Sequence, residues 1–161
     1  MTSTDLPPAA SATAAADGVF WLFDVDGTLI DGITGCSLRP GARELLVALR
    51  SRGIRVLLWS SGGGEYAWRR ARETGFDDLV DAAYDKRRDD PARPWDLPGV
   101  LAERPPAVLV DDMPAEVPAV GEIVAVRQYL GPNPYDTGLQ PLLHRLAATA
   151  DGGGGRGGDR R

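Results

Sequence analysis

The chain has 161 residues, of which 43% are hydrophobic, and its 18 basic and 23 acidic side chains give a net charge of −5. This length and composition predict one globular domain with a sizeable core and leave no room for a second domain. The acidic balance argues against a nucleic-acid partner, and the single cysteine, Cys36, excludes both an internal disulfide and a zinc site built from cysteines.

The two ends of the chain differ in composition from the rest. Residues 1–17 are rich in Ala, Ser, Thr and Pro, and residues 150–161 are dominated by glycine and charge. We expect both segments to be disordered tails, with residues 18–149 as the folded domain. The N-terminal segment lacks the pattern of a signal peptide, and no apolar run approaches the roughly 20 residues that span a bilayer. A cytoplasmic protein without a membrane partner is therefore expected.

The first apolar run begins at Val19 and ends abruptly in two carboxylates, Asp24 and Asp26, followed by Gly27 and Thr28. An apolar run of this length between turn residues is typical of a strand that is buried on both faces. Two neighbouring carboxylates repel each other unless a cation lies between them. Mg²⁺, which favours carboxylate and phosphate oxygens, would remove that repulsion.

Further along, short apolar runs alternate with segments of helical spacing. Leu29 to Arg39, with its Asp-Gly pair, predicts a tight hairpin or flap. The elements predicted after it are a helix starting at Pro40 and stopped by Gly53, a strand over Ile54–Trp59, a helix over Glu65–Thr74, a strand near Val80–Tyr84, a weak helix near Pro98–Glu103, strands over Ala107–Val110 and Ile123–Val126, and a helix over Leu139–Ala148. This alternation predicts a Rossmann-like parallel sheet of about five strands in a three-layer α/β/α sandwich.

Polar side chains follow the ends of four predicted strands. Beyond the first pair of aspartates they are Ser60 with Ser61, Lys86, and Asp111 with Asp112. The carboxyl ends of parallel strands lie at one edge of a sheet, so we expect these groups to gather there. Lys86 stands out because the other basic residues are all arginines, and a compact ammonium fits between a carboxylate and a phosphate where a guanidinium does not.

In order and type, these residues resemble the four motifs of the haloacid dehalogenase-like superfamily of phosphohydrolases. The segment from Asp24 to Thr28 matches the first motif, Asp-x-Asp-Gly-Thr, at every fixed position, and the resemblance covers most of Gly18 to Asp112. It implies Mg²⁺-dependent hydrolysis of a phosphomonoester through an aspartyl-phosphate. In this scheme Asp24 is the nucleophile, and Asp26 is the general acid and base.

The same resemblance assigns the remaining roles. The phosphate of the substrate would be bound by Thr28, by Lys86 and by Ser60 or Ser61, a choice that stays open. Mg²⁺ would be held by the Asp24 carboxylate, the backbone carbonyl of Asp26 and a carboxylate of the fourth motif. By position, Asp112 is the direct ligand, whereas Asp111 acts through a water or orients Lys86.

The spacing of the motifs leaves no room for a cap domain. The gap after the first motif is the eleven-residue flap, and the segment from Ser61 to Asp85 is filled by one helix and one strand. The chain therefore resembles a capless member of the superfamily, with an open site for a macromolecular phosphoester, or for a small one if a second subunit of a homo-oligomer covers the cleft. Trp95 and the arginines beside Lys86, at positions 87, 88 and 93, are further candidates for substrate contact. The alternative is a non-catalytic module of the same fold that binds phosphate or a protein.

Overall fold

A computed structural model describes residues 18–151, so the predicted tail 1–17 and residues 152–161 of the predicted tail 150–161 lie outside the described residues. Its centre is a five-stranded parallel sheet in the order β3-β2-β1-β4-β5. The strands are β1 (Phe20–Asp24), β2 (Arg55–Ser60), β3 (Ala82–Asp85), β4 (Val108–Asp111) and β5 (Glu122–Ala125). The predicted α/β class and five-stranded parallel sheet are confirmed.

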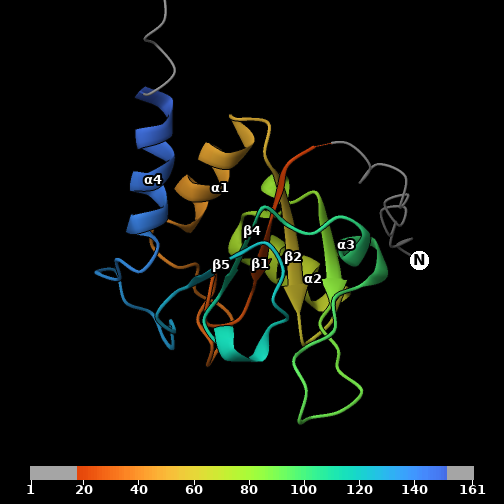
Figure 1. Ribbon diagram of the computed structural model, residues 1–161. Helices are drawn as coiled ribbons and strands as arrows, with labels where there is room; N and C mark the ends of the chain where they lie inside the picture. Colours follow the sequence, from red (N-terminus) through yellow and green to blue (C-terminus); the bar gives the residue numbers. More distant parts are fainter. Residues whose placement is uncertain (1–17, 152–161) are drawn as a thin grey trace, which may run out of the picture.

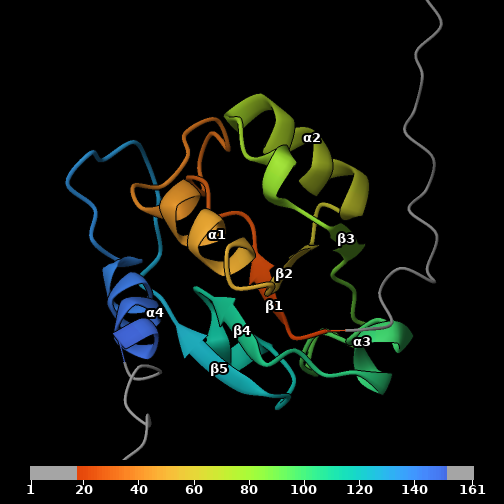
Figure 2. The ribbon, with the colours of Figure 1, turned by 90° about the horizontal axis from the view of Figure 1, so that it is seen from above.

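Helices flank this sheet unequally. They are α1 (Ala42–Arg50), α2 (Gly64–Thr74), α3 (Gly99–Glu103) and α4 (Gln140–Asp151), with short 3-10 helices at Asp77–Leu79 and Pro114–Glu116. Figures 1 and 2 show α1 and α2 on one face of the sheet and α3 on the other, with α4 beside α1. Among residues 18–151 no helix is long and apolar enough to cross a membrane.

The strands alternate their side chains between these two faces. Trp21 and Phe23 of β1 belong to the larger hydrophobic cluster, which includes buried leucines of α1 and α4. Phe20 and Leu22 belong to the smaller cluster under α3. Continuing the period of two places Asp24 on the α3 face, where, within residues 18–151, the five-residue helix α3 and loops pack against the sheet. The thinly covered face therefore leads to the candidate site.

The strand order also determines where a ligand fits. From β1 the chain continues into β2 on one side and later into β4 on the other, so the order reverses beside β1. Ligands of open α/β sheets bind outside the carboxyl ends of the strands at such a reversal. Phe23 pairs with Val110, which brings Asp24 level with Asp111 across the β1–β4 pair.

Several predicted boundaries shift. Pro40 was expected at the first helical position, but α1 starts at Ala42, and Gly41 precedes it with φ of 83°; this left-handed residue separates the proline from the helix. β3 begins at Ala82 rather than near Val80, because the 3-10 helix Asp77–Leu79 precedes it and the N–H of Val80 still donates to the carbonyl of Asp77. α4 extends to Asp151 and so includes two residues that were assigned to the tail.

Candidate active site

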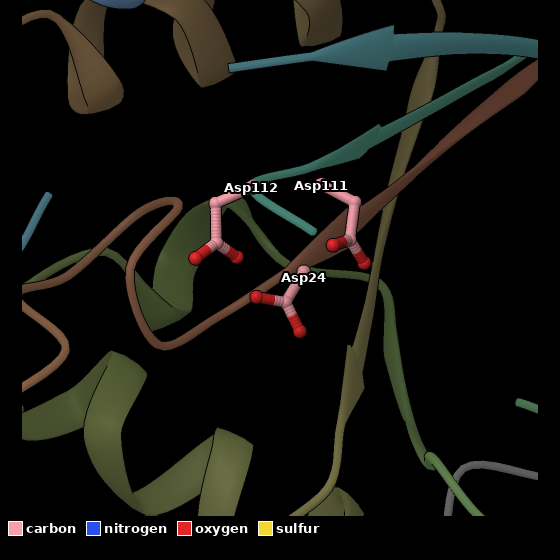
Figure 3. Close-up of side chains that lie close together, drawn as sticks. All are labelled: Asp24, Asp111 and Asp112. Atoms are coloured by element: carbon pink, nitrogen blue, oxygen red, sulfur yellow. The ribbon is translucent and has the colours of Figure 1, made fainter. Parts of the chain in front are cut away.

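Three carboxylates converge at the carboxyl edge of the sheet. Asp24 ends β1, and Asp111 and Asp112 stand at the end of β4. One oxygen from each lies within 4.8 Å of the other two, and Figure 3 shows the three side chains pointing toward a shared space. Asp24 and Asp111 are buried, with 7% and 0% of their surface exposed. The predicted nucleophile and both candidate metal ligands of the fourth motif are thus brought together.

Lys86 lies among these carboxylates, as its position after β3 predicted. Its Nζ donates to Asp111 Oδ2 at 2.8 Å and to Asp24 Oδ1 at 3.1 Å, and the residue is 7% exposed. Burial opposes its charged form, but the two aspartates outweigh that effect and raise the pKa of Lys86. The ammonium is therefore retained next to the candidate nucleophile.

One ammonium does not balance three carboxylates. Burial raises the pKa of Asp24 well above its usual range; Lys86 opposes this shift, and Asp111 and Asp112 add to it. Such a surplus of buried negative charge is costly unless a cation compensates it. The cluster therefore has the charge of a site for a divalent cation.

Asp112 offers a further observation about the donor set. Its Oδ2 is buried and has no hydrogen-bond partner among the described residues. A Cβ on Gly27, where φ is +82°, would lie 2.5 Å from this oxygen, so only glycine allows the first-motif loop to approach so closely. An unpartnered carboxylate oxygen beside two other carboxylates fits a hard, oxygen-preferring cation such as Mg²⁺.

Thr28 was predicted to bind substrate, but its side chain faces inward. The residue is fully buried, and its hydroxyl lies 3.2 Å from both Asp24 Oδ2 and Asp112 Oδ1. A hydroxyl carries one hydrogen, so it donates to one carboxylate at a time. Thr28 therefore lies between Asp24 and Asp112 and can orient either carboxylate, and its role in binding substrate stays a prediction.

Asp26 lies apart from the three-carboxylate cluster. Its Oδ1 accepts a hydrogen bond of 2.7 Å from the hydroxyl of Tyr66, on α2. Arg70, one turn later on the same helix, lies 5.2 Å from the ring centroid of Tyr66. The carboxylate of the candidate acid and base is thus oriented by α2, a helix that no motif in the sequence links to the site.

The two candidate serines occupy different environments. Ser60 ends β2 and is buried, whereas Ser61 is exposed in the following turn. Ser60 Oγ accepts a hydrogen bond from the N–H of Gly62 at 3.2 Å, so its own hydroxyl hydrogen is not used in that bond. The carbonyl of Ser60 accepts from the N–H of Lys86 at 2.7 Å. Neither hydroxyl bonds to the aspartate cluster within residues 18–151. The position of Ser60, beside Lys86 at the end of the strand, favours it over Ser61.

The candidate substrate contacts around Lys86 divide into two groups. Trp95 lies beside the site, since its ring centroid is 5.6 Å from Lys86 Nζ. The ring centroid of the buried Trp59, on β2, lies 5.0 Å from the same Nζ. Arg88 stacks over Trp95 with Cζ 4.5 Å from the centroid. The arginines at positions 87 and 93 are exposed and pair with Asp85 and Asp90.

A buried ion pair behind the site was not anticipated. Arg39, at the end of the predicted flap, is 1% exposed and donates to Asp136 at 2.6 Å. Its other donors reach the carbonyl oxygens of Thr28 at 3.2 Å and Arg127 at 2.7 Å. This contact ties the first-motif loop to the segment after β5. A charged pair 97 residues apart leaves no local signal in the sequence.

The flap is organised around Asp31. Ile30 and Leu38 form an antiparallel bridge at its base, and the buried Asp31 carboxylate accepts bonds from backbone N–H groups of the segment 33–37 and from the Thr34 hydroxyl. Burial opposes ionisation of Asp31, but these donors, led by Thr34, lower its pKa to about 2. The predicted hairpin is thus a loop folded around one carboxylate.

Comparison with known proteins adds information on the fold. No protein-family model matches the chain, and no curated protein matches it. The crystal structure of a hypothetical protein from Xanthomonas campestris is similar, with a TM-score of 0.52 and 21% identity over 92% of this chain and 91% of that one. This likeness supports the α/β fold over nearly the whole length of the chain.

Proposed function

We propose that this chain is a capless, Mg²⁺-dependent phosphomonoesterase that acts through an aspartyl-phosphate. The observation that carries the proposal is the position of Lys86 between Asp24 and Asp111, in a cluster with a buried Asp112 oxygen that has no partner among residues 18–151. Three converging carboxylates and one ammonium have the charges needed to bind a divalent cation together with a phosphate. The segment Asp24–Thr28 resembles the first motif of the dehalogenase-like superfamily, and this resemblance supports the same reaction.

The residues present fit Mg²⁺. The Asp24 and Asp112 carboxylates and the backbone carbonyl of Asp26 would hold it, and Asp111 is occupied by Lys86 and by the N–H of Met113 at 2.7 Å. When bound, Mg²⁺ supplies positive charge that offsets the phosphoryl oxygens and the carboxylates together.

In the first step Asp24 attacks phosphorus and forms an acyl phosphate while the ester P–O bond breaks. Asp26 donates a proton to the leaving oxygen, held in orientation by the hydroxyl of Tyr66. Lys86 stabilises the negative charge that Asp24 shares with the phosphoryl group. In the second step water attacks the phosphorus, Asp26 takes its proton, and phosphate and the Asp24 carboxylate are released.

The test is hydrolysis of an aryl phosphate by the purified protein, with Mg²⁺ and with a chelator. We expect Mg²⁺-dependent turnover that falls about a thousandfold or more in Asp24→Asn. Asp78→Asn, an exposed aspartate whose side chain pairs with Arg43 on the surface, is the matched control and should retain activity. A folded protein that binds Mg²⁺ and phosphate but turns over no member of a broad phosphoester panel would replace this proposal with the non-catalytic binding module.

A further inference from the structure

A continuous row of contacts leads outward from the candidate nucleophile. Asp24 accepts from Lys86 at 3.1 Å, and the Lys86 ammonium lies 5.6 Å from the ring centroid of Trp95. Arg88 Cζ lies 4.5 Å from the same centroid. The two cations therefore share one indole, and they cannot be farther apart than these two distances combined. In Figure 1 the segment that carries Arg88, between β3 and α3, projects from the carboxyl edge of the sheet.

The indole that they share is held in place. The backbone N–H of Trp95 donates to the carbonyl of Glu116 at 2.7 Å, and its Nε1 donates to Glu116 Oε2 at 3.0 Å. Glu116 belongs to the 3-10 helix just after Asp111 and Asp112. The ring is thus fixed from the loop of the fourth motif, so it forms a rigid platform beside the candidate phosphate site.

Arg88 differs from its neighbours in the same segment. It is half-buried, and its Nη1 makes one long bond, 3.4 Å, to the carbonyl of Arg93. Within residues 18–151 it pairs with no carboxylate, whereas Arg87 pairs with Asp85 and Arg93 with Asp90. Stacking keeps the guanidinium in place while most of its donors point to no acidic partner. A planar fork of this kind binds carboxylate and phosphate groups in a bidentate manner.

We propose that the substrate is a phosphomonoester with a second anionic group, a carboxylate or a phosphate, which Arg88 binds on the Trp95 platform. The scissile phosphate lies at Asp24 and Lys86, and the linking part of the substrate lies along the indole. This inference rests on the proposed function for the placement of the scissile phosphate. Trp95 and Arg88 then select the substrate, a task that a cap domain would otherwise perform.

The experiment measures binding without turnover. Titration calorimetry in the presence of Mg²⁺ compares alkyl phosphonates that end in a carboxylate with the same compounds ending in the isosteric carboxamide, over a series of chain lengths. A parallel series with a terminal phosphate distinguishes the two kinds of second anion. We expect the preferred anionic ligand to bind the wild type about tenfold to a hundredfold more tightly than its neutral partner.

Three arginine variants distinguish a specific site at Arg88 from a general effect of positive charge. Arg88→Gln should reduce the preference to within about twofold, whereas Arg87→Gln, which removes the same charge from an exposed neighbour, should retain it. Arg88→Lys keeps the charge but loses the planar fork, so most of the preference should disappear. Trp95→Leu removes the platform and should reduce the preference in the same direction, provided that circular dichroism shows a folded protein.

The outcomes distinguish this inference from the proposed function. Turnover of aryl phosphates together with equal binding of charged and neutral phosphonates would overturn the second-anion site and leave the phosphatase intact. A preference that survives in Arg88→Gln would also overturn it. An Arg88-dependent preference in a protein without any phosphatase activity would keep the site and remove the proposed function.

Discussion

Lys86 and Arg39 are both buried cations beside aspartates, yet their surroundings differ in charge balance. Arg39 faces one buried carboxylate, Asp136, and its other donors reach backbone carbonyl oxygens. Lys86 faces two carboxylates, and the neighbouring Asp112 has an oxygen without a partner in the described part of the chain. In the first group the Asp136 carboxylate is matched by Arg39, with the exposed Arg127 lying 3.9 Å from it, whereas the second group carries surplus negative charge.

The pKa values of the aspartates reflect this difference. Burial opposes ionisation of Asp136, but hydrogen bonds from Arg39 and from the N–H of Gly138 lower its pKa. For Asp24 burial dominates over Lys86, and the pKa is raised. A balanced buried pair stabilises the fold, whereas an unbalanced one marks a place where a ligand is needed. The same substitution, aspartate to asparagine, should therefore have opposite effects in the two places.

The largest effect is expected for Asp24→Asn. Activity should fall about a thousandfold or more, because the proposed nucleophile is lost. In the presence of a chelator, the free energy of unfolding should rise by about 1 kcal/mol, because one of three crowded carboxylates is neutralised. Chemical denaturation and a turnover assay measure both quantities. A loss of stability similar to that of Asp136→Asn would contradict the comparison.

Asp136→Asn should show the reverse pattern. It leaves the buried Arg39 guanidinium without its carboxylate, so the free energy of unfolding should fall by about 3 kcal/mol. Turnover per folded molecule should change far less than in Asp24→Asn, because Asp136 does not contact the carboxylate cluster. Denaturation midpoints and active-site-normalised rates check this expectation. An equal loss of activity in the two variants would place the Arg39 contact in the catalytic machinery.

Mg²⁺ should stabilise the wild type at the unbalanced site. Binding to the folded state at a hundredfold excess over Kd contributes about 2.7 kcal/mol, which appears as a rise in Tm. Asp112→Asn should remove most of this rise, since it removes a candidate ligand, and Asp136→Asn should retain it. An equal rise in all three proteins would show that Mg²⁺ binds elsewhere.

Acid should weaken the balanced regions first. The pKa of Asp31 is lowered to about 2, and that of Asp136 is also lowered, so both stabilise the fold fully above about pH 4. This contribution is lost as the pH falls from about 4 toward 2, when protons bind to the folded carboxylates. The free energy of unfolding, measured between about pH 4 and 2, should depend less on pH in Asp31→Asn than in the wild type. An unchanged slope would contradict the stabilising role of the Asp31 carboxylate.

The smallest effect is expected for Tyr66→Phe. It removes one hydrogen bond to Asp26 and leaves the ring in place on α2. We expect kcat for a phosphoester with a poor leaving group to fall about tenfold, because the proposed proton donor, Asp26, is no longer held in orientation. A good leaving group needs less proton donation and should be less affected. Equal losses for both substrates would indicate a general structural effect.

Much of the fold followed from the chain itself. Apolar runs that stop at Asp24, Ser60 and Asp111 predicted the strands, and their alternation with helical segments predicted the parallel sheet. The sheet then required the polar groups to share one edge, which is why Lys86 could be placed near the aspartates before any contact was known. Side-chain periodicity and the alternation of strands with helices can be read along the chain, and they decide the strands, the parallel sheet and the edge where the polar groups meet.

Only the tertiary structure decided how the site is supported. Thr28 turns inward, Tyr66 orients Asp26, Arg39 pairs with Asp136, and Trp95 is held by Glu116. The contacts of Tyr66, Arg39 and Trp95 join segments that are far apart in the sequence. The contact of Thr28 with Asp24 is local, but it depends on a side-chain orientation that the motif does not specify. Such pairs have no common period or spacing. They form because packing of α2, the flap and the segment after β5 brings their side chains together, and the cost of burying an unpaired polar group selects the partners.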